Sequence, residues 1–169
     1  MMAVQRNVNV IAIDIDSHGL KRLRSKNKFV DVVLADATNI PLRANILDAA
    51  FMMEVLDYIP ELETVLSECS RILKSGGSLV FSFGNKASLK SKLRELHGKH
   101  YMHSYRKVVQ SVDKSGLQVV KKEGFNWLPF NRTSGNPLIP LLAKIEKLFG
   151  LRKICRFSPW VLIYAVKPE

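Results

Sequence analysis

The sequence has few cysteines, no long apolar run and no glycine before Gly19. Its two cysteines, Cys69 and Cys155, lack the spacing of metal ligands and are expected to be reduced intracellular thiols. No apolar run approaches the ~20 residues of a membrane span, and no signal-peptide core precedes the first apolar segment. No glycine-rich loop precedes the first expected strand. The sequence therefore predicts one cytoplasmic domain over residues 1–169, with no transmembrane segment.

Positive charge is concentrated in the later part of the chain. The net charge is +11, and residues 1–60 contribute seven basic and seven acidic side chains. Residues 61–169 contribute nineteen basic and eight acidic side chains. A basic excess favours anionic partners such as nucleic acid, phospholipid head groups or phosphorylated substrates. A basic surface that only keeps the protein soluble is an equally good interpretation.

Apolar patterning predicts strands that alternate with helices. Strands are expected at Val8–Asp14, Val30–Leu34, Leu47–Met53, Ser78–Phe83, Leu117–Lys122 and Trp160–Val166. Helices are expected after Asp16 and at Glu61–Leu73, Ala87–Leu96, Ser104–Lys114 and Leu138–Phe149, with a loop over Leu128–Pro137. Gly76 and Gly77 are expected to end the Glu61–Leu73 helix. The alternation predicts an α/β fold with a doubly wound sheet.

Candidate binding residues follow the expected strands. Asp14 ends the first strand, and a carboxylate there can accept hydrogen bonds from both hydroxyls of a ribose. Helix capping is the alternative, but Asp16 already suits that purpose. Asp36 follows the second strand, where it either contacts a ligand or starts a turn. Met53 stands at the end of the third strand, and open α/β sheets bind ligands at that edge, so Met53 is a candidate cofactor-binding residue.

Three segments carry a family resemblance: Leu34–Leu42, Leu47–Ile59 and Ile72–Phe83. They resemble the class I S-adenosylmethionine-dependent methyltransferases, type 11 group. The resemblance implies a Rossmann-like, mostly parallel sheet whose last strand is antiparallel, and S-adenosyl-L-methionine as cofactor. It implies that Asp14 binds the ribose, with Ile15 against the adenine. It also implies that Asp36 meets the adenine amino group and that the Ala37 N–H meets the ring.

The resemblance also suggests residues that face the substrate. Asp57 and Tyr58 stand where the family commonly has a Glu-His pair, although Tyr58 packed on the core is the simpler interpretation. Asn85 matches an asparagine often found at the rim of the active site. Residues 123–158 are expected to form an insertion that contributes to a substrate lid.

The resemblance begins at the family's second strand. The first strand, the glycine-rich loop and the first helix have no counterpart in the sequence. Three explanations are open: a shortened chain, a partner chain that supplies the missing strand, or a relic that no longer binds cofactor. We expect the first. In that case the strands ending at Asp14 and Met53 would face a gap, or would close up against each other.

Two other segments invite alternative interpretations. Residues 86–114 hold eight basic and two acidic side chains, with His97, His100 and His103 among them. Without a nearby cysteine or acidic partner these histidines predict no metal site. The Leu138–Phe149 helix is amphipathic, so it either packs on its own domain or contacts a membrane surface.

The sequence thus predicts methyl transfer from S-adenosylmethionine to an unidentified small acceptor, anionic or linked to a lipid or saccharide. Nucleic acid is a possible acceptor that the sequence does not favour, and no catalytic residue is assigned. One rival is a non-catalytic binding module, or partner subunit, with a basic anion-binding face. A nicotinamide oxidoreductase would share Asp14, but Asp36 follows the methyltransferase layout.

Overall fold

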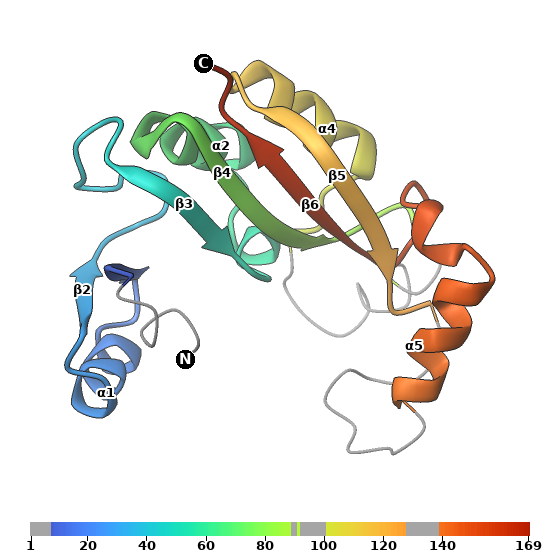
Figure 1. The fold of residues 1–169 in the computed structure, drawn as a ribbon, viewed down its shortest axis with the longest axis horizontal. Coiled ribbons are helices and arrows are strands. Elements are labelled where there is room, and N and C mark those ends of the chain that lie inside the picture. The colour runs from blue at the N-terminus through green and yellow to red at the C-terminus, as the bar shows by residue number, and fades with distance from the viewer. Residues whose placement is uncertain (1–7, 89–90, 92–100, 128–138) are drawn as a thin grey trace. The chain divides into compact units, whose positions relative to one another are not determined.

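A computed structural model describes residues 8–88, 91, 101–127 and 139–169 (Figure 1). Its contacts divide the chain into two compact units, Met1–Arg43 and Ala44–Glu169. Each unit is described by itself.

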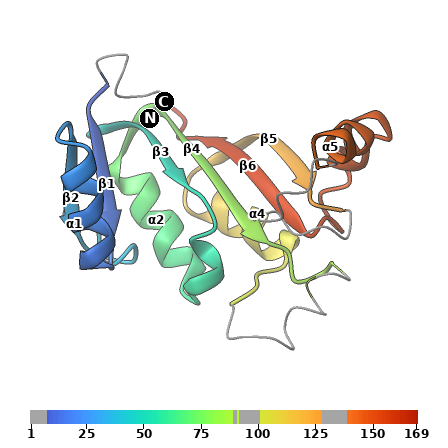
Figure 2. The same ribbon diagram turned by 90° about the horizontal axis from the view of Figure 1, so that it is seen from below.

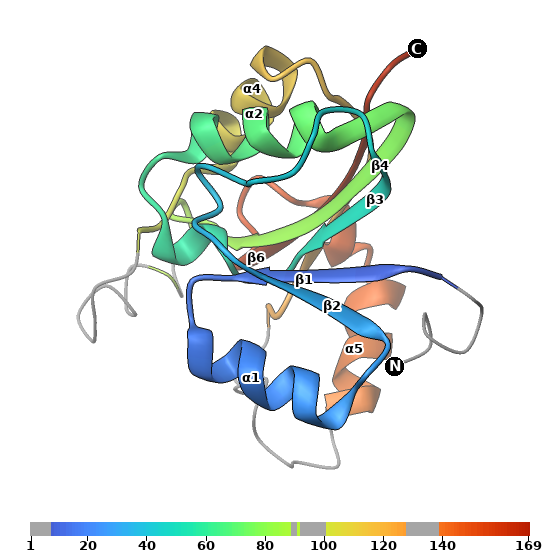
Figure 3. The ribbon, with the colours of Figure 1, turned by 90° about the vertical axis from the view of Figure 1, so that its left-hand side faces the viewer.

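The first unit is a β-α-β arrangement. Strand β1, Val10–Asp14, pairs in parallel with β2, Val30–Leu34. Between them helix α1, Ser17–Lys26, runs along one face of the pair (Figure 3). The helix begins where the sequence predicts, because the Asp16 side chain caps it by accepting a hydrogen bond from the backbone N–H of His18.

The second unit contains a four-stranded sheet with the strand order β3-β4-β6-β5 (Figure 2). Its strands are β3 (Leu47–Met52), β4 (Leu73–Gly84), β5 (Gln118–Phe125) and β6 (Trp160–Val166). Strands β3 and β4 are parallel, whereas β6 is antiparallel to both β4 and β5. The antiparallel last strand is therefore confirmed.

Helices α2, Leu62–Ile72, and α4, Tyr105–Lys114, contact each other and cover one face of this sheet (Figures 1 and 3). The core between them and the sheet consists of large side chains with almost no exposed area. These include Leu62, Val65, Leu66, Ile72, Leu79, Phe81, Phe83, Val108, Val112 and Ile163. Burial of so many aliphatic and aromatic groups is the main source of this unit's stability.

Three short elements complete the second unit. They are the 3₁₀ turns η2, Leu56–Tyr58, and η4, Leu151–Lys153, and helix α5, Ile139–Leu148. Helix α5 contacts η4, and η4 contacts β5. The loop expected at Leu128–Pro137 lies outside the described residues. Most of the helix expected at Ala87–Leu96 also lies outside them.

The α/β class is confirmed, and the strands form two hydrogen-bonded groups, β1-β2 and β3-β4-β6-β5. Strand β1 pairs with β2, β3 pairs with β4, and these pairs belong to different sheets. Among the described residues no strand pairs with the second edge of β1 or with the outer edge of β3. The apolar pattern of a strand indicates burial, but it does not identify the neighbouring strand.

Helix α2 also ends earlier than expected. Its last residue is Ile72, and the cap residue Leu73 already begins β4 by pairing with Leu47. Gly76 has a φ of 73°, which favours glycine, but it lies in an irregular stretch of β4. There its N–H donates to the carbonyl of Lys167 at 2.9 Å. Leu73 already has an extended backbone, with φ −74° and ψ 140°, so the helix ends before the chain reaches the glycine pair.

Candidate functional site

Two carboxylates lie at the same edge of the first unit. Asp14 and Leu34 are register partners at the carboxyl ends of β1 and β2, and Asp36 follows two residues later. The N–H of Ala35 donates to the carbonyl of Asp14 at 3.1 Å, which joins the two chain segments as they leave the sheet. Asp14 and Asp36 therefore share one edge as expected, whereas Met53, which we expected at the same edge, belongs to the second unit.

Asp14 presents a carboxylate to solvent. Its Oδ1 accepts a hydrogen bond from the N–H of Asp16 at 2.9 Å, and no described residue bonds its Oδ2. Asp16 is the residue that caps α1, so the capping alternative for Asp14 is wrong. Next to it, the side chain of Ile15 is 73% exposed. An open carboxylate oxygen beside an exposed apolar side chain can contact both the hydroxyls and the flat face of a nucleoside.

Asp36 is also exposed and starts a turn. Its Oδ1 accepts from the backbone N–H of Thr38 at 2.8 Å and from the Thr38 hydroxyl at 2.7 Å. These two bonds hold the pKa of Asp36 below its usual value, so the carboxylate is ionised at neutral pH. The turn alternative is therefore correct in geometry. This turn leaves Asp36 available to a ligand, because no described residue bonds its Oδ2. Ala37, whose N–H is the other expected contact, follows in the same turn.

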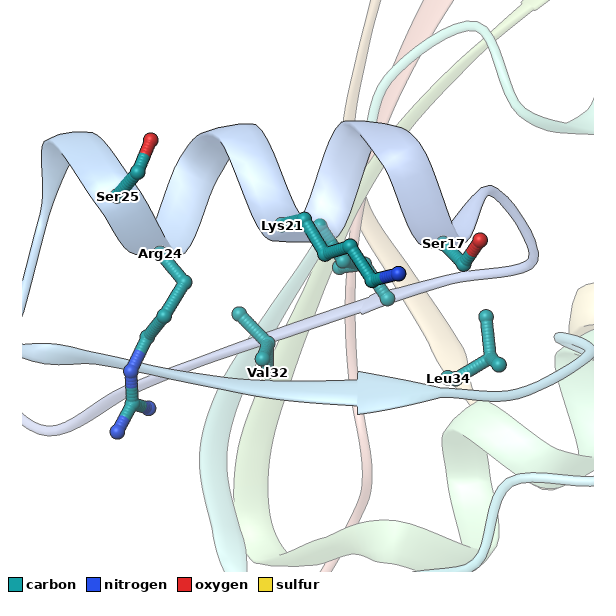
Figure 4. A pocket seen from close by; sticks show the side chains of 7 residues that line it. Ser17, Lys21, Arg24, Ser25, Val32 and Leu34 are labelled. Atoms are coloured by element: carbon teal, nitrogen blue, oxygen red, sulfur yellow. The ribbon is translucent and has the colours of Figure 1, made fainter.

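A separate cavity of about 500 Å³ lies between α1 and β2 (Figure 4). Leu20, Val32 and Leu34 form its apolar surface, and Lys21 and Arg24 stand over it from the helix. Neither Asp14 nor Asp36 lines this cavity. It is therefore distinct from the carboxylate edge, although the two share the end of β2.

In the second unit, the end of β3 has an unusual backbone. Met52 is buried, Met53 is 46% exposed, and Glu54 then adopts a φ of 61°. The N–H of Glu54 donates to the hydroxyl of Ser82 at 3.1 Å. A side chain other than glycine in this conformation is uncommon and is found disproportionately at functional sites. The strained residue stands at the carboxyl edge of β3 and β4.

Asp57 and Tyr58, both in η2, have opposite surroundings. Asp57 is buried, and its Oδ1 accepts from the N–H of Gly84 at 2.8 Å while its carbonyl accepts from Tyr101 at 2.8 Å. Gly84 allows this approach, since a Cβ there would lie 2.7 Å from the Asp57 Oδ2. Tyr58 is 65% exposed. Asp57 therefore anchors the turn, and Tyr58 is the member of the pair that presents a side chain to solvent.

Asn85 is fully buried and not at an open rim. Its Nδ2 lies within hydrogen-bond distance of the carbonyls of Cys155, Arg156 and Ser158, at 3.4, 2.9 and 3.0 Å. Its Oδ1 accepts from the N–H groups of Ala87 and Tyr105 at 3.2 and 3.1 Å. Because the whole amide is engaged within the protein, any contact with a substrate would require one of these bonds to break.

His103 is a structural residue that the sequence did not single out for this role. It is buried, its backbone bridges Asn85, and its Nε2 lies 3.0 Å from the carbonyl of Ile59. His97 and His100 lie outside the described residues. Among the residues that the structure does describe, no three His, Cys, Asp or Glu side chains cluster as metal ligands. Only the fold brings His103 to Ile59, so no local signal could have identified the contact.

Residues 1–81 match the family described as "Methyltransferase domain". The match spans β1 to most of β4, and therefore includes the carboxylate edge of the first unit and the Met53–Tyr58 turn of the second. The first 81 of the 169 residues are thus similar to this methyltransferase family.

Curated methyltransferases are similar to most of the chain. A malonyl-[acyl-carrier protein] O-methyltransferase of Methylococcus capsulatus is 27% identical over 168 residues, which cover 94% of this chain and 59% of that protein. A ubiquinone biosynthesis O-methyltransferase of Thiobacillus denitrificans is 26% identical, covering 73% of this chain and 61% of that protein. The chain thus spans about three fifths of the length of these two methyltransferases.

Solved methyltransferase structures have the same fold. The geranyl diphosphate C-methyltransferase of Streptomyces coelicolor superposes with a TM-score of 0.72 over 98% of this chain and 68% of that protein, at 21% identity. A methyltransferase of Thermotoga maritima superposes with a TM-score of 0.66 over 98% of this chain and 75% of that protein, at 20% identity. The Rossmann-like fold class predicted from the sequence is confirmed.

Proposed function

We propose that this chain carries the adenosine-binding part of an S-adenosylmethionine-dependent methyltransferase, at Asp14, Ile15, Asp36 and Ala37. The observation that carries the proposal is the shared edge of β1 and β2. Two exposed carboxylates meet there, and each keeps one oxygen outside its own turn. Carboxylates at the ends of parallel strands are how Rossmann-like folds bind the ribose of a nucleotide cofactor.

The residues present fit an adenosine group. The open Oδ2 of Asp14 can accept from a ribose hydroxyl, and the exposed Ile15 offers an apolar surface for the base. Ionised Asp36 can accept from an exocyclic amino group. S-adenosylmethionine, when bound, supplies a methyl group on a positively charged sulfur.

The contribution of the second unit to methyl transfer would be positional. Methyl transfer is a direct displacement, so the protein's main task is to hold the acceptor in line with the reactive carbon. Met53 and Tyr58 present exposed side chains at the carboxyl end of β3 and in the turn that follows, where Asp57 fixes the backbone. These residues would contact the acceptor, and residues 123–158 would contribute to covering it.

We further propose an acceptor that is anionic or linked to a lipid or saccharide. The support is the excess of basic side chains in residues 61–169, nineteen against eight acidic. One relative is named as acting on malonyl-[acyl-carrier protein], and a structural neighbour was solved with geranyl diphosphate. Malonyl and diphosphate groups both carry negative charge.

Backbone amide NMR of this chain, titrated with adenosine and with S-adenosylhomocysteine, tests the proposed site. We expect weak binding, of the order of 1 mM. Amide shifts should be largest at residues 14–16 and 36–38, where the carboxylates and their turns lie. The rival, a binding module for anions alone, predicts no shifts with uncharged adenosine.

Two substitutions make the test specific. Asp14→Ala removes the proposed ribose acceptor and should weaken binding roughly tenfold, as expected for loss of a hydrogen bond to an anion. Asp31→Ala is the matched control, because Asp31 is an exposed carboxylate on the neighbouring strand that pairs with Arg24 at 3.6 Å. Equal binding by wild type and Asp14→Ala would remove Asp14 from the site.

A further inference from the structure

We infer that residues 139–157 form a contact surface for membranes that contain anionic phospholipids. This stretch, here called the basic-apolar segment, comprises α5, the turn after it, η4 and the residues up to Phe157. The inference does not depend on methyl transfer. It concerns the surface that the protein binds, and not the reaction at its acceptor.

The basic-apolar segment exposes large apolar side chains that a purely structural helix would bury. Leu148 is 82% exposed and Phe149 is 72% exposed, and among the large apolar residues described in the second unit only Phe51, at 75%, is comparably exposed. Leu141 stands two turns before Leu148, so both lie on one face of α5. Ile154 and Phe157 extend the exposed apolar set beyond η4.

The exposed charges of this segment are all positive. Lys144 and Lys147 stand on α5, and Lys153 and Arg156 follow. Among the described residues, none of these four cations has a carboxylate within ion-pair distance. A fifth cation of the segment, Arg152, does have such a partner, because its Nη1 lies 3.6 Å from Oε2 of Glu123.

The one acidic residue of the segment points away from this surface. Glu146 is buried, and its Oε1 accepts a hydrogen bond from the backbone N–H of Trp127 at 2.8 Å. This contact fixes which side of α5 faces the protein. The opposite side then presents Leu141, Lys144 and Leu148 to the surroundings.

Apolar side chains flanked by lysines are the pattern that binds the interface of an anionic bilayer. The apolar groups enter the acyl boundary, and the cations meet the head-group phosphates. A nucleic acid would contact the cations through its phosphates, but Leu148 and Phe149 would stay exposed to water. The ten residues of α5 are too few to span a bilayer, and no described helix is long and apolar enough to do so. The segment would therefore lie on the surface.

Co-sedimentation of the chain with vesicles tests the inference. With equal parts of phosphatidylglycerol and phosphatidylcholine we expect the chain to pellet, and with phosphatidylcholine alone we expect it to stay in the supernatant. Added salt should weaken the interaction, because exposed charges are screened.

Two double variants separate the apolar and the charged contributions. Leu148→Ser/Phe149→Ser should reduce vesicle affinity by roughly tenfold or more, because two large apolar groups no longer leave water. Lys144→Ala/Lys147→Ala should reduce it by roughly fivefold per lysine. Circular dichroism melts should match the wild type, since all four side chains are exposed.

Matched controls come from other surfaces of the same unit. Val120→Ser changes an apolar side chain that is 57% exposed on β5, and Arg106→Ala/Lys107→Ala removes two exposed cations from α4. Both should bind vesicles as the wild type does.

Four results would overturn the inference. The first is no pelleting with phosphatidylglycerol vesicles. The second is pelleting that Leu148→Ser/Phe149→Ser leaves unchanged. The third is a vesicle-free dimer that this double variant converts to a monomer, which would assign the surface to a second copy of the chain. Tight binding to single-stranded RNA that depends on Lys144 and Lys147 but not on Leu148 and Phe149 would likewise contradict a lipid surface.

Discussion

Polar side chains are used in opposite ways in the two units. In Met1–Arg43 the aspartates are exposed, and Asp14, Asp16 and Asp36 bond partners only two residues away. In Ala44–Glu169 the polar groups Asp57 and Asn85 are buried and bond partners 20 to 73 residues away, apart from the local bond to Ala87. Local bonds orient a carboxylate but leave it accessible. Long-range bonds hold distant segments together.

This difference bears on which residues to associate with ligand binding. A buried amide whose donors and acceptors are all engaged contributes to stability, because each group left unpaired would cost about 1–3 kcal/mol. An exposed carboxylate with an open oxygen contributes little to folding and is available to a ligand. By this criterion Asp14 and Asp36 remain ligand candidates, whereas Asn85 is foremost a structural residue.

The largest effect is expected for Asn85→Ala. The substitution leaves carbonyls near Cys155, Arg156 and Ser158 and two N–H groups without their partner. We expect a loss of about 3 kcal/mol or more in the free energy of unfolding. Urea denaturation followed by circular dichroism measures it.

Asn39→Ala is the control for Asn85, because Asn39 is exposed in the first unit and should change stability by no more than about 0.5 kcal/mol. Similar losses for the two variants would break the proposed contrast between the units.

A smaller effect is expected for Gly124→Ala. A Cβ at this position on β5 would lie 2.6 Å from the Cβ of Ser158, which is fully buried and bonded to the carbonyl of Trp160 at 2.7 Å. Because neither group can move freely, we expect a loss of about 1–3 kcal/mol. Thermal melts of the purified variant measure this.

Gly19→Ala in α1 is the counterpart in the first unit. There the nearest atom to a new Cβ is the Asp16 Oδ2, at 2.9 Å, the end of an exposed side chain. Alanine also favours a helix, so the net change should stay below about 1 kcal/mol. A Gly19→Ala variant as unstable as Gly124→Ala would show that the first unit is packed as rigidly as the second.

The smallest effect concerns the ionisation of Asp36. The backbone N–H and the hydroxyl of Thr38 lower the pKa of Asp36 below 3.8, so its bonds favour the folded state above that pH. This contribution is lost as the pH falls through the folded-state pKa. Thr38→Val removes the hydroxyl bond and should raise the pKa toward 3.8, as measured by carbon NMR of the carboxyl group. Thr38→Ser keeps the hydroxyl and should leave the pKa low; an equal rise in both variants would rule out the hydroxyl as a cause.

The sequence predicted the elements better than their assembly. Four of the six described strands, β1, β2, β3 and β6, begin and end within two residues of their predicted positions, because continuous apolar runs and caps such as Asp16 are local signals. Strand β5 continues to Phe125, beyond the predicted Lys122, because it pairs with β6 along its whole length. Pairing depends on a partner far along the chain, so the apolar pattern could not define it.

The same distinction between local and long-range signals applies to the candidate site residues. Asp14 and Asp36 could be predicted to share an edge, because both follow parallel strands. The burial of Asn85 could not be predicted, because the carbonyls that accept from its side chain lie 70 to 73 residues away. Asp57 similarly depends on Gly84, 27 residues later. A motif locates such residues, but only the tertiary contacts show whether their atoms are available.

The strand order has a consequence for synthesis on the ribosome. Strand β6 is the last of the described strands to be translated, yet it lies between β4 and β5 in the sheet. Neither of those strands can complete its backbone pairing until residues 160–166 have left the exit tunnel. Until then β4 and β5 expose edges that can recruit other chains. The nascent protein is therefore expected to depend on chaperones longest for its second unit, while β1 and β2 can already have paired.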